Sequence, residues 1–125
     1  MARLKILVVD DNQDFCESVR DILEAEGHEV QATYDGQSAV ELAQKECFGL
    51  ILMDLVIPGM DGVTAIKAIR KTSPSVPIIV VTAFGEESII EEAFRAGANK
   101  QFGKPIDFNR LLADISKNDH YGASA

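Results

Sequence analysis

The sequence predicts an α/β fold, a doubly wound five-stranded parallel sheet with five helices on its two faces. Short apolar runs rich in β-branched residues alternate along the chain with segments of helical periodicity. Turn-forming residues stand between the runs and the helical segments. The sequence contains no internal repeat and no low-complexity tract, so we treat the alternation as one folded unit.

The first half of the chain supplies three strands and two helices. Leu4–Val9 is a continuous apolar run, as expected for a strand buried on both faces. Glu29–Thr33 and Leu50–Met53 are the second and third strands. Gly27 ends the first helix, and Asp35 is placed to cap the second. The apolar faces of these two helices are formed by Phe15, Val19, Ile22, Leu23, Ala39, Leu42 and Ala43.

The second half continues the alternation with three helices and two strands. The third helix ends near Thr72, and Ile78–Val81 is the most strand-like run in the chain. The pattern predicts a helix over 85–96, a last strand over Lys100–Phe102, and a final helix capped by Asp107. The residues expected to face inward from these helices are Val63, Ile66, Ile69, Ile89, Ile90, Ala93, Phe94, Phe108, Leu111, Leu112 and Ile115.

Length and charge limit the possible functions. The 125 residues suffice for one domain with a hydrophobic core, and we expect residues 1–118 to form it and residues 119–125 to form a flexible tail. The formal net charge of −8 argues against direct binding to nucleic acid or to an anionic membrane, because their phosphates would be repelled. The apolar run near the N-terminus is too short to span a membrane and lacks a signal-peptide cleavage site. Cys16 and Cys47 are interpreted as small core residues, and a cytoplasmic location is expected.

Polar side chains follow each predicted strand, although the second is followed only by Tyr34 and Asp35. In open α/β sheets, ligands bind at the carboxyl ends of the strands, beside the point where the strand order reverses. With the strand order 2-1-3-4-5, the first and third strands are neighbours. The strand ends then bring three carboxylates, one hydroxyl and one ammonium group to one edge of the sheet: Asp10, Asp11, Asp54, Thr82 and Lys104.

Each of these residues alone has a simpler explanation as a turn residue, a helix cap or a solvated lysine. Together they predict more, because carboxylates a few ångströms apart repel unless a cation neutralises them or one stays protonated. Mg²⁺ binds one or two carboxylates and leaves positions for water and a phosphate oxygen. A lysine and a threonine hydroxyl can both bind a phosphoryl group. The set therefore fits phosphoryl transfer with a carboxylate as the nucleophile.

Four stretches, in this order, match a known family: ILVVDDN at 6–12, LILMDLVIPGMDG at 50–62, VVTAFG at 80–85 and GKPID at 103–107. On these stretches the chain resembles the response-regulator receiver domains of two-component signalling over almost its whole length. Among them it is similar to the stand-alone receivers of phosphorelays and chemotaxis. The resemblance implies the flavodoxin-like receiver fold.

The resemblance also implies the chemistry of the site. Asp54 would accept a phosphoryl group from a phosphohistidine donor and form an acyl phosphate. Mg²⁺, or Mn²⁺, would be held by Asp10, Asp11, Asp54 and the backbone carbonyl of Val56. Such a domain catalyses only its own phosphorylation and dephosphorylation and is therefore not an enzyme in the usual sense.

The same resemblance implies that Thr82 is the switch hydroxyl and that Lys104, joined to Pro105 by a cis peptide bond, pairs with the phosphoryl group. One position departs from the family pattern. Tyr or Phe usually stands three residues before this lysine, where this chain has Gln101. Phe102 should face the opposite side of the sheet, because side chains alternate along a strand. We interpret Gln101 as a surface residue of an edge strand, which weakens a switch based on aromatic–threonine coupling and suits a stand-alone phosphorelay receiver.

Val56 and Phe84 lie two residues after Asp54 and Thr82, where the family places residues that flank the phosphoryl group. Both are apolar and cannot orient an attacking water, so we expect slow loss of phosphate from the acyl phosphate. Local packing explains these two residues equally well.

The leading hypothesis is a single-domain response regulator. It would receive phosphate from a histidine kinase or a histidine phosphotransfer protein, act on a downstream effector protein, and be a monomer when unphosphorylated. The start of the chain just before the first strand and the short tail favour this over a receiver excised from a longer regulator or hybrid kinase. A flavodoxin-like cofactor-binding protein shares the architecture, but Asp10 and Asp11 would repel the phosphate of FMN. A P-loop NTPase is excluded because no GxxxxGK motif occurs.

Overall fold

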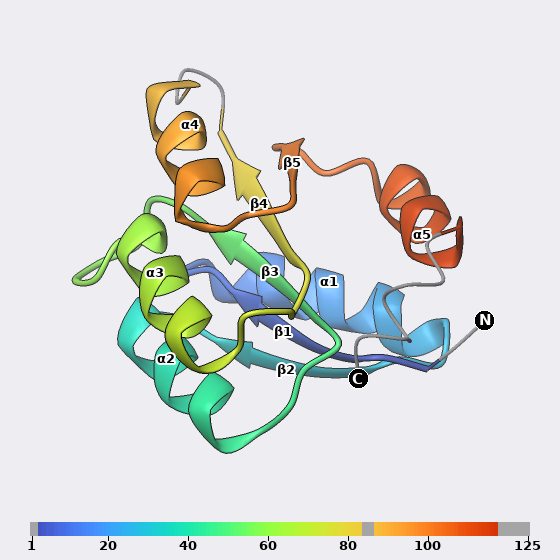
Figure 1. The fold of residues 1–125 in the computed structure, drawn as a ribbon. Helices are drawn as coiled ribbons and strands as arrows, with labels where there is room; N and C mark the ends of the chain where they lie inside the picture. The colour runs from blue at the N-terminus through green and yellow to red at the C-terminus, as the bar shows by residue number, and fades with distance from the viewer. Residues whose placement is uncertain (1–2, 84–86, 118–125) are drawn as a thin grey trace.

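A computed structural model describes residues 3–83 and 87–117 of the chain (Figure 1). The expected flexible tail, residues 119–125, lies outside the described residues. The strands form one parallel sheet in the order β2-β1-β3-β4-β5, which confirms the predicted fold class and strand order. Among the described residues the strands are β1 (Lys5–Val9), β2 (Glu29–Thr33), β3 (Leu50–Asp54), β4 (Ile78–Thr82) and β5 (Lys100–Gly103).

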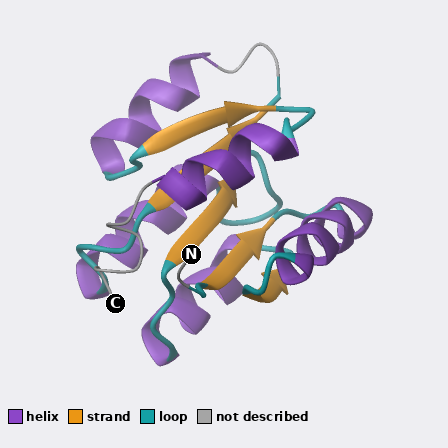
Figure 2. Cartoon of the chain, turned by 90° about the vertical axis from the view of Figure 1, so that its right-hand side faces the viewer, coloured by secondary structure: helices purple, strands orange, loops and turns teal. Residues whose placement is uncertain are grey.

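Helices cover both faces of this sheet, as the doubly wound topology requires (Figures 1 and 2). In the part of the chain that the structure describes, the helices are α1 (Gln13–Ala25), α2 (Gly36–Lys45), α3 (Gly62–Thr72), α4 (Glu87–Ala96) and α5 (Phe108–Lys117). Residues of α1 and α5 pack on one face, and residues of α2, α3 and α4 pack on the other.

The core consists of two apolar layers, one on each face of the sheet. Along β3, Leu50 and Leu52 contribute to the layer under α1 and α5, whereas Ile51 and Met53 contribute to the layer under α2, α3 and α4. All residues of β3 and β4 are buried, which explains why these strands read as continuous apolar runs. The edge strand β5 instead alternates between half-buried and exposed residues, so its pattern in the sequence is weaker.

Residues in the loops after β1, β2 and β3 cap the N-termini of the helices that follow. Asn12 accepts a hydrogen bond from the Phe15 N–H, and Asp35 accepts one from the Ser38 N–H, which confirms Asp35 as the predicted cap. Asp61 caps α3 in the same way. These caps fix where each loop at the carboxyl edge of the sheet passes into its helix.

The structure differs from the sequence-based expectations at a few positions. Phe94 was expected to face inward but is 41% exposed, because α4 packs at the side of the sheet that ends with the edge strand β5, and Ala93 is the residue that α4 buries fully. Cys16 is buried as predicted, whereas the same prediction for Cys47 is wrong, since this residue is exposed in the loop after α2. The expected first residues of the fourth helix, at 85 and 86, lie outside the described residues.

Candidate functional site

The carboxyl edge of the sheet brings the predicted strand-end residues together. β1 and β3 are neighbours, so Asp10, directly after β1, lies beside Asp54, the last residue of β3. Thr82 ends β4 and pairs in register with Gly103 of β5, so the next residue, Lys104, also reaches this edge. Asp54 and Thr82 belong to their strands rather than to the loops that follow, which fixes their backbones in the sheet.

Asp10 is the most firmly held carboxylate of the site. It is 1% exposed, and its Oδ1 accepts a hydrogen bond of 2.9 Å from the Asn12 N–H. Its own N–H donates to the Thr33 carbonyl at 3.2 Å, and the Cys16 thiol donates to its carbonyl at 3.4 Å. Burial raises the pKa of Cys16 to about 11, so this thiol remains protonated and acts only as a donor.

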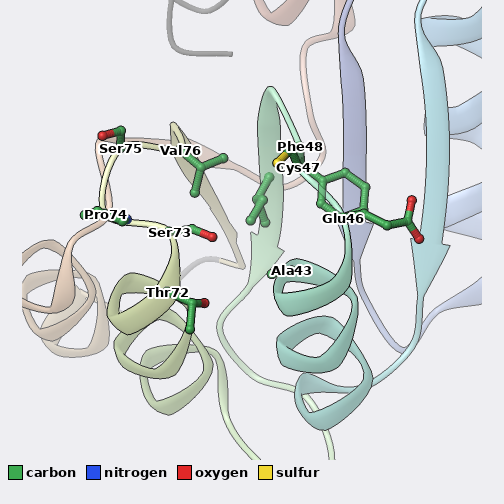
Figure 3. Close-up of a pocket in the computed structure, with 10 residues that line it drawn as sticks. Ala43, Glu46, Cys47, Phe48, Thr72, Ser73, Pro74, Ser75 and Val76 are labelled. Atoms are coloured by element: carbon green, nitrogen blue, oxygen red, sulfur yellow. The ribbon is translucent and has the colours of Figure 1, made fainter.

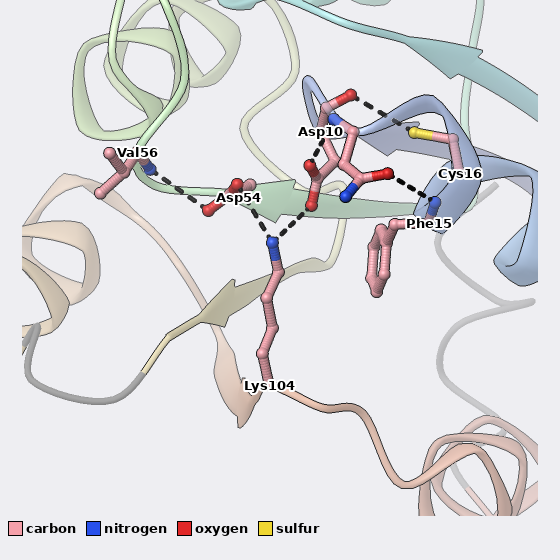
Figure 4. A network of polar contacts seen from close by, with 7 residues as sticks. Asp10, Phe15, Cys16, Asp54, Val56 and Lys104 are labelled. Carbon is pink, nitrogen blue, oxygen red and sulfur yellow. Dashed lines mark hydrogen bonds and ion pairs between the residues drawn. The ribbon is translucent and has the colours of Figure 1, made fainter.

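Lys104 connects the two buried carboxylates, as Figure 4 shows. Its Nζ donates to Asp10 Oδ2 at 2.7 Å and to Asp54 Oδ2 at 3.3 Å. Burial opposes the charged form of Lys104, but the hydrogen bond to Asp10 and the charge of Asp54 outweigh it and raise the lysine pKa. The ammonium group is therefore a permanent positive charge at this edge.

Asp54 lies in a less favourable environment for a charge. It is 7% exposed, and its Oδ1 accepts a hydrogen bond of 3.2 Å from the Val56 N–H. Burial and the neighbouring Asp10 raise the pKa of Asp54 despite the opposing effect of Lys104. An added positive charge nearby would therefore stabilise the ionised form of Asp54.

The three carboxylates fit a hard divalent cation. Asp10, Asp11 and Asp54 each offer an oxygen atom, and these atoms lie within 4.8 Å of one another. Two oxygen ligands on opposite sides of one Mg²⁺ are about 4 Å apart, so small side-chain rotations would bring these atoms to ligand distance. Asp11 is exposed, which leaves one side of the cluster open to solvent and to an incoming phosphoryl group.

The remaining predicted residues are placed as follows. Thr82 is 2% exposed, and its carbonyl accepts the Lys104 N–H at 2.8 Å. The Lys104–Pro105 peptide bond is cis. Val56 is 52% exposed beside Asp54, Gln101 is exposed on β5, and Phe84 lies outside the described residues. Phe102, next to Gln101, packs toward α1 and α5, as the alternation along the strand predicts.

Two contacts of the site were not predicted from the sequence. The Phe15 ring lies below the Lys104 ammonium, 4.9 Å from Nζ to the ring centroid, in a cation–π contact. The Cys16 thiol supports the Asp10 backbone, as described above. Both residues lie on the first turn of α1 and follow an N-cap asparagine, so the capping motif was the signal that could have placed them near this edge.

A separate cavity of about 210 Å³ lies at the opposite edge of the sheet, between the loops that follow α2 and α3 (Figure 3). Ala43, Phe48 and Val76 form apolar parts of its wall, and Cys47 and Thr72 contribute polar atoms. None of the strand-end residues lines it. The predicted site is therefore confined to the carboxyl edge.

A parallel sheet in this order, with an acidic cluster and a half-buried lysine at its carboxyl edge, defines the class of flavodoxin-like receiver domains. Comparison with protein families agrees, since residues 6–116 match the family described as the response regulator receiver domain. The chain belongs to this family. As a receiver domain it is not a conventional enzyme.

Several relatives and solved structures are similar to this chain. Sporulation initiation phosphotransferase F of Bacillus subtilis is 32% identical over 94% of this chain and 94% of its own length. Chemotaxis protein CheY of the same organism is 37% identical over 90% of this chain and 95% of its own length. A CheY-like receiver domain protein from Methanospirillum hungatei superposes with a TM-score of 0.91 at 28% identity, covering 99% of this chain and all of that one.

Longer proteins also match. Transcriptional regulatory protein ZraR of Salmonella typhimurium is 35% identical over 92% of this chain, but the chain spans only 26% of its length. The receiver fold thus occurs both alone and within longer regulators among these relatives. Within the described residues, no helix is long and apolar enough to cross a membrane.

Proposed function

We propose that this chain is a single-domain response regulator that accepts a phosphoryl group on Asp54, with Mg²⁺ or Mn²⁺ held by Asp10, Asp11, Asp54 and the Val56 carbonyl. The observation that carries the proposal is the half-buried lysine shared by Asp10 and Asp54, at 2.7 Å and 3.3 Å, beside three convergent carboxylates. A site that concentrates negative charge and holds one fixed positive charge suits a dianionic phosphoryl group once a divalent cation is added.

In the transfer step, a carboxylate oxygen of Asp54 attacks phosphorus and forms the P–O bond as the P–N bond to the donor histidine breaks. The electron pair of that bond returns to the imidazole nitrogen. Lys104 stabilises the phosphoryl oxygens, and the Val56 N–H holds the other Asp54 oxygen in place. The bound cation would supply further neutralisation of the phosphoryl charge.

The signalling step belongs to Thr82 and its surroundings. The Thr82 hydroxyl would bind the phosphoryl group and pull the end of β4 toward Asp54, and the changed surface would be read by a downstream effector protein. Gln101, exposed on β5, cannot follow this movement inward as a buried aromatic ring would. This supports a relay, in which phosphate is passed on, over an aromatic-coupled switch.

Similarity to two relatives over nearly their whole length supports a stand-alone receiver protein, with residues 1–118 as the receiver domain. The phosphodonor would be a histidine kinase or a histidine phosphotransfer protein, and the site of action the cytoplasm. The unphosphorylated chain would be a monomer that binds neither nucleic acid nor membranes directly.

The test is phosphorylation by acetyl phosphate with Mg²⁺, followed by intact-mass measurement. We expect a mass gain of one phosphoryl group that EDTA prevents and that is absent from Asp54→Asn. Radiolabelled transfer from candidate histidine kinases of the source organism then identifies the donor. If neither acetyl phosphate nor any kinase labels the wild-type protein, the proposal is wrong.

A further inference from the structure

The loop between β3 and α3, residues 55–61, lies against two buried glycines at the starts of two different helices. Gly62 is the first residue of α3, and Gly36 is the first residue of α2. The loop begins directly after Asp54 and contains Val56. Its position therefore decides where the Val56 backbone lies relative to the phosphorylation site.

Gly36 meets the end of this loop at very short range. A Cβ atom built on Gly36 would lie 2.5 Å from the Met60 carbonyl oxygen, and also 3.2 Å from the Met60 Cβ and 3.3 Å from its carbonyl carbon. These distances are well below the roughly 3.5–4.0 Å at which carbon atoms pack favourably. The closest atom belongs to the backbone, so it cannot move aside by a side-chain rotation. Only glycine lets α2 and the loop approach this closely.

Gly62 holds the start of the same loop. Its N–H donates to the Leu55 carbonyl at 3.0 Å, and a Cβ there would lie 2.6 Å from both the Asp54 carbonyl oxygen and the Leu55 Cα. Between the two contacts, Gly59 adopts a positive φ of 74°, which turns the loop back. The loop is thus fixed at both ends and turned in the middle.

We propose that Gly36, which is remote from Asp54 in the sequence, is a positioning residue of the phosphorylation site. By allowing α2 to lie against the Met60 carbonyl, it fixes the loop so that the Val56 N–H reaches Asp54 Oδ1 at 3.2 Å and the Val56 carbonyl is presented to the cation. This inference rests on the proposed function, because it concerns the loop that would supply the carbonyl ligand.

A methyl group at position 36 would force the loop, rather than α2, to move. The start of α2 is tied by Asp35, which accepts hydrogen bonds from the Ser38 N–H at 2.7 Å and from the Ser38 hydroxyl at 3.1 Å. Ala39 and Val40 in the next turn are buried in the core. Residues 55–61 form no helix or strand, although Leu55 and Ile57 are buried in the core. We expect the displacement, on the order of 1 Å, to be taken up in this loop, to reach Val56 and to weaken ligand positioning.

The experiment compares wild type, Gly36→Ala and a matched control, Gly49→Ala. Gly49 precedes β3 at the opposite edge of the sheet, and the atoms nearest to a Cβ there would be two of the Leu4 side chain, at 3.1 Å and 3.7 Å, and the Lys5 carbonyl oxygen at 3.8 Å. We expect Gly36→Ala to bind Mg²⁺ about ten-fold more weakly than wild type in calorimetric titration. The amide resonance of Val56 should shift in the metal-free protein. Gly49→Ala should lose stability without either change.

The outcomes separate the inference from the proposed function. If the wild-type protein fails to bind Mg²⁺, the proposed function is wrong, and this inference falls with it. If wild type binds Mg²⁺ and Gly36→Ala binds it equally well with an unshifted Val56 amide, Gly36 has only a packing role and the inference alone is overturned. Should Gly36→Ala not fold in buffer, all three proteins are compared in trimethylamine N-oxide, which favours the folded state.

Discussion

The Lys104 ammonium lies closer to Asp10 than to Asp54, at 2.7 Å against 3.3 Å. Asp10 is also the more deeply buried of the two carboxylates, 1% exposed against 7%. The lysine therefore binds more tightly to Asp10 than to Asp54, the proposed phosphoryl acceptor, although both belong to the acidic cluster. It can lengthen its contact with Asp54 when a phosphoryl group arrives and still remain anchored by Asp10.

The first prediction concerns the metal-free stability of the site. Lys104→Met leaves two buried carboxylates without their shared cation, so we expect the unfolding free energy to fall by about 1–3 kcal/mol at neutral pH in EDTA. The loss should shrink in saturating Mg²⁺, because the cation binds the folded state and takes over the neutralisation. Urea denaturation with and without Mg²⁺ measures both effects.

The control for Lys104→Met is Lys100→Met. Lys100 also forms an ion pair, with Asp114, but its side chain is 38% exposed, and such pairs contribute little. The unfolding free energy of Lys100→Met should therefore fall only slightly, and by the same amount with and without Mg²⁺. If the two variants respond to Mg²⁺ alike, Lys104 does not neutralise the carboxylate cluster.

The second prediction concerns pH and His28. This histidine is 3% exposed, its Nδ1 accepts the Leu4 N–H at 3.0 Å, and its Nε2 has no hydrogen-bond partner among the described residues. Burial lowers its pKa below the ordinary value near 6.5. Below that ordinary value the unfolded chain binds a proton that the folded chain does not, so stability falls as the pH drops toward the folded-state pKa.

We therefore expect the unfolding free energy of the wild type to decrease between pH 7 and 5.5 relative to His28→Gln, with a limiting slope of about 1.4 kcal/mol per pH unit. Guanidinium denaturation across this range gives the two profiles. Glutamine keeps a hydrogen-bond acceptor but does not titrate. Parallel profiles would show that His28 takes up its proton as readily in the folded protein as in the unfolded chain.

The third prediction concerns Arg70, which ties α3 to the turn after α4. Its Nε and Nη2 donate to the Gly97 carbonyl at 3.1 Å and 2.7 Å, and it also donates to Ser73 and Asn99. A lysine ammonium cannot reproduce this planar fork, so we expect Arg70→Lys to lower the unfolding free energy by about 1–3 kcal/mol. Lys67→Met, on the exposed face of the same helix, should change it by less than about 0.5 kcal/mol in the same urea titration. Equal losses in both variants would mean that the network contributes nothing beyond surface charge.

The sequence predicts the site better than it predicts such contacts. Asp10, Asp54, Thr82 and Lys104 could be assigned to one edge because parallel strands end on the same side of a sheet, and this depends only on strand order. The contact of Arg70 with Gly97 joins residues 27 positions apart. It depends on side-chain conformations, which strand order does not determine.

The sequence-based predictions that are wrong also concern features that depend on the arrangement of the elements in space. Helical periodicity placed Phe94 on the inner face of α4, but periodicity cannot show that the sheet ends beneath this helix and leaves part of that face uncovered. Cys47 is followed in the sequence by Phe48 and the apolar run of β3, yet the chain turns there between α2 and β3 and exposes it. The close approach of α2 at Gly36 to the Met60 carbonyl could not be predicted from the sequence, in which only the glycine itself points to it.

The last prediction concerns how long the phosphorylated state survives. Val56 is 52% exposed next to Asp54, and its apolar side chain offers no hydrogen bond to a water molecule approaching phosphorus. Val56→Asn combined with Phe84→Glu supplies polar groups at both positions that the family places beside the phosphoryl group. We expect the acyl phosphate of this double variant to decay several-fold faster than that of wild type in Mg²⁺. The decay is followed by intact mass after removal of acetyl phosphate.

The single variant Val56→Asn separates the two positions, because Val56 lies beside Asp54 in the structure. Val56→Ala is the matched control, since it shortens the side chain without adding a polar group that could orient water. If alanine accelerates decay as much as asparagine does, the valine protects the phosphoryl group by covering it. If neither the single variants nor the double variant alters the decay, the two apolar residues serve local packing and do not slow the loss of phosphate.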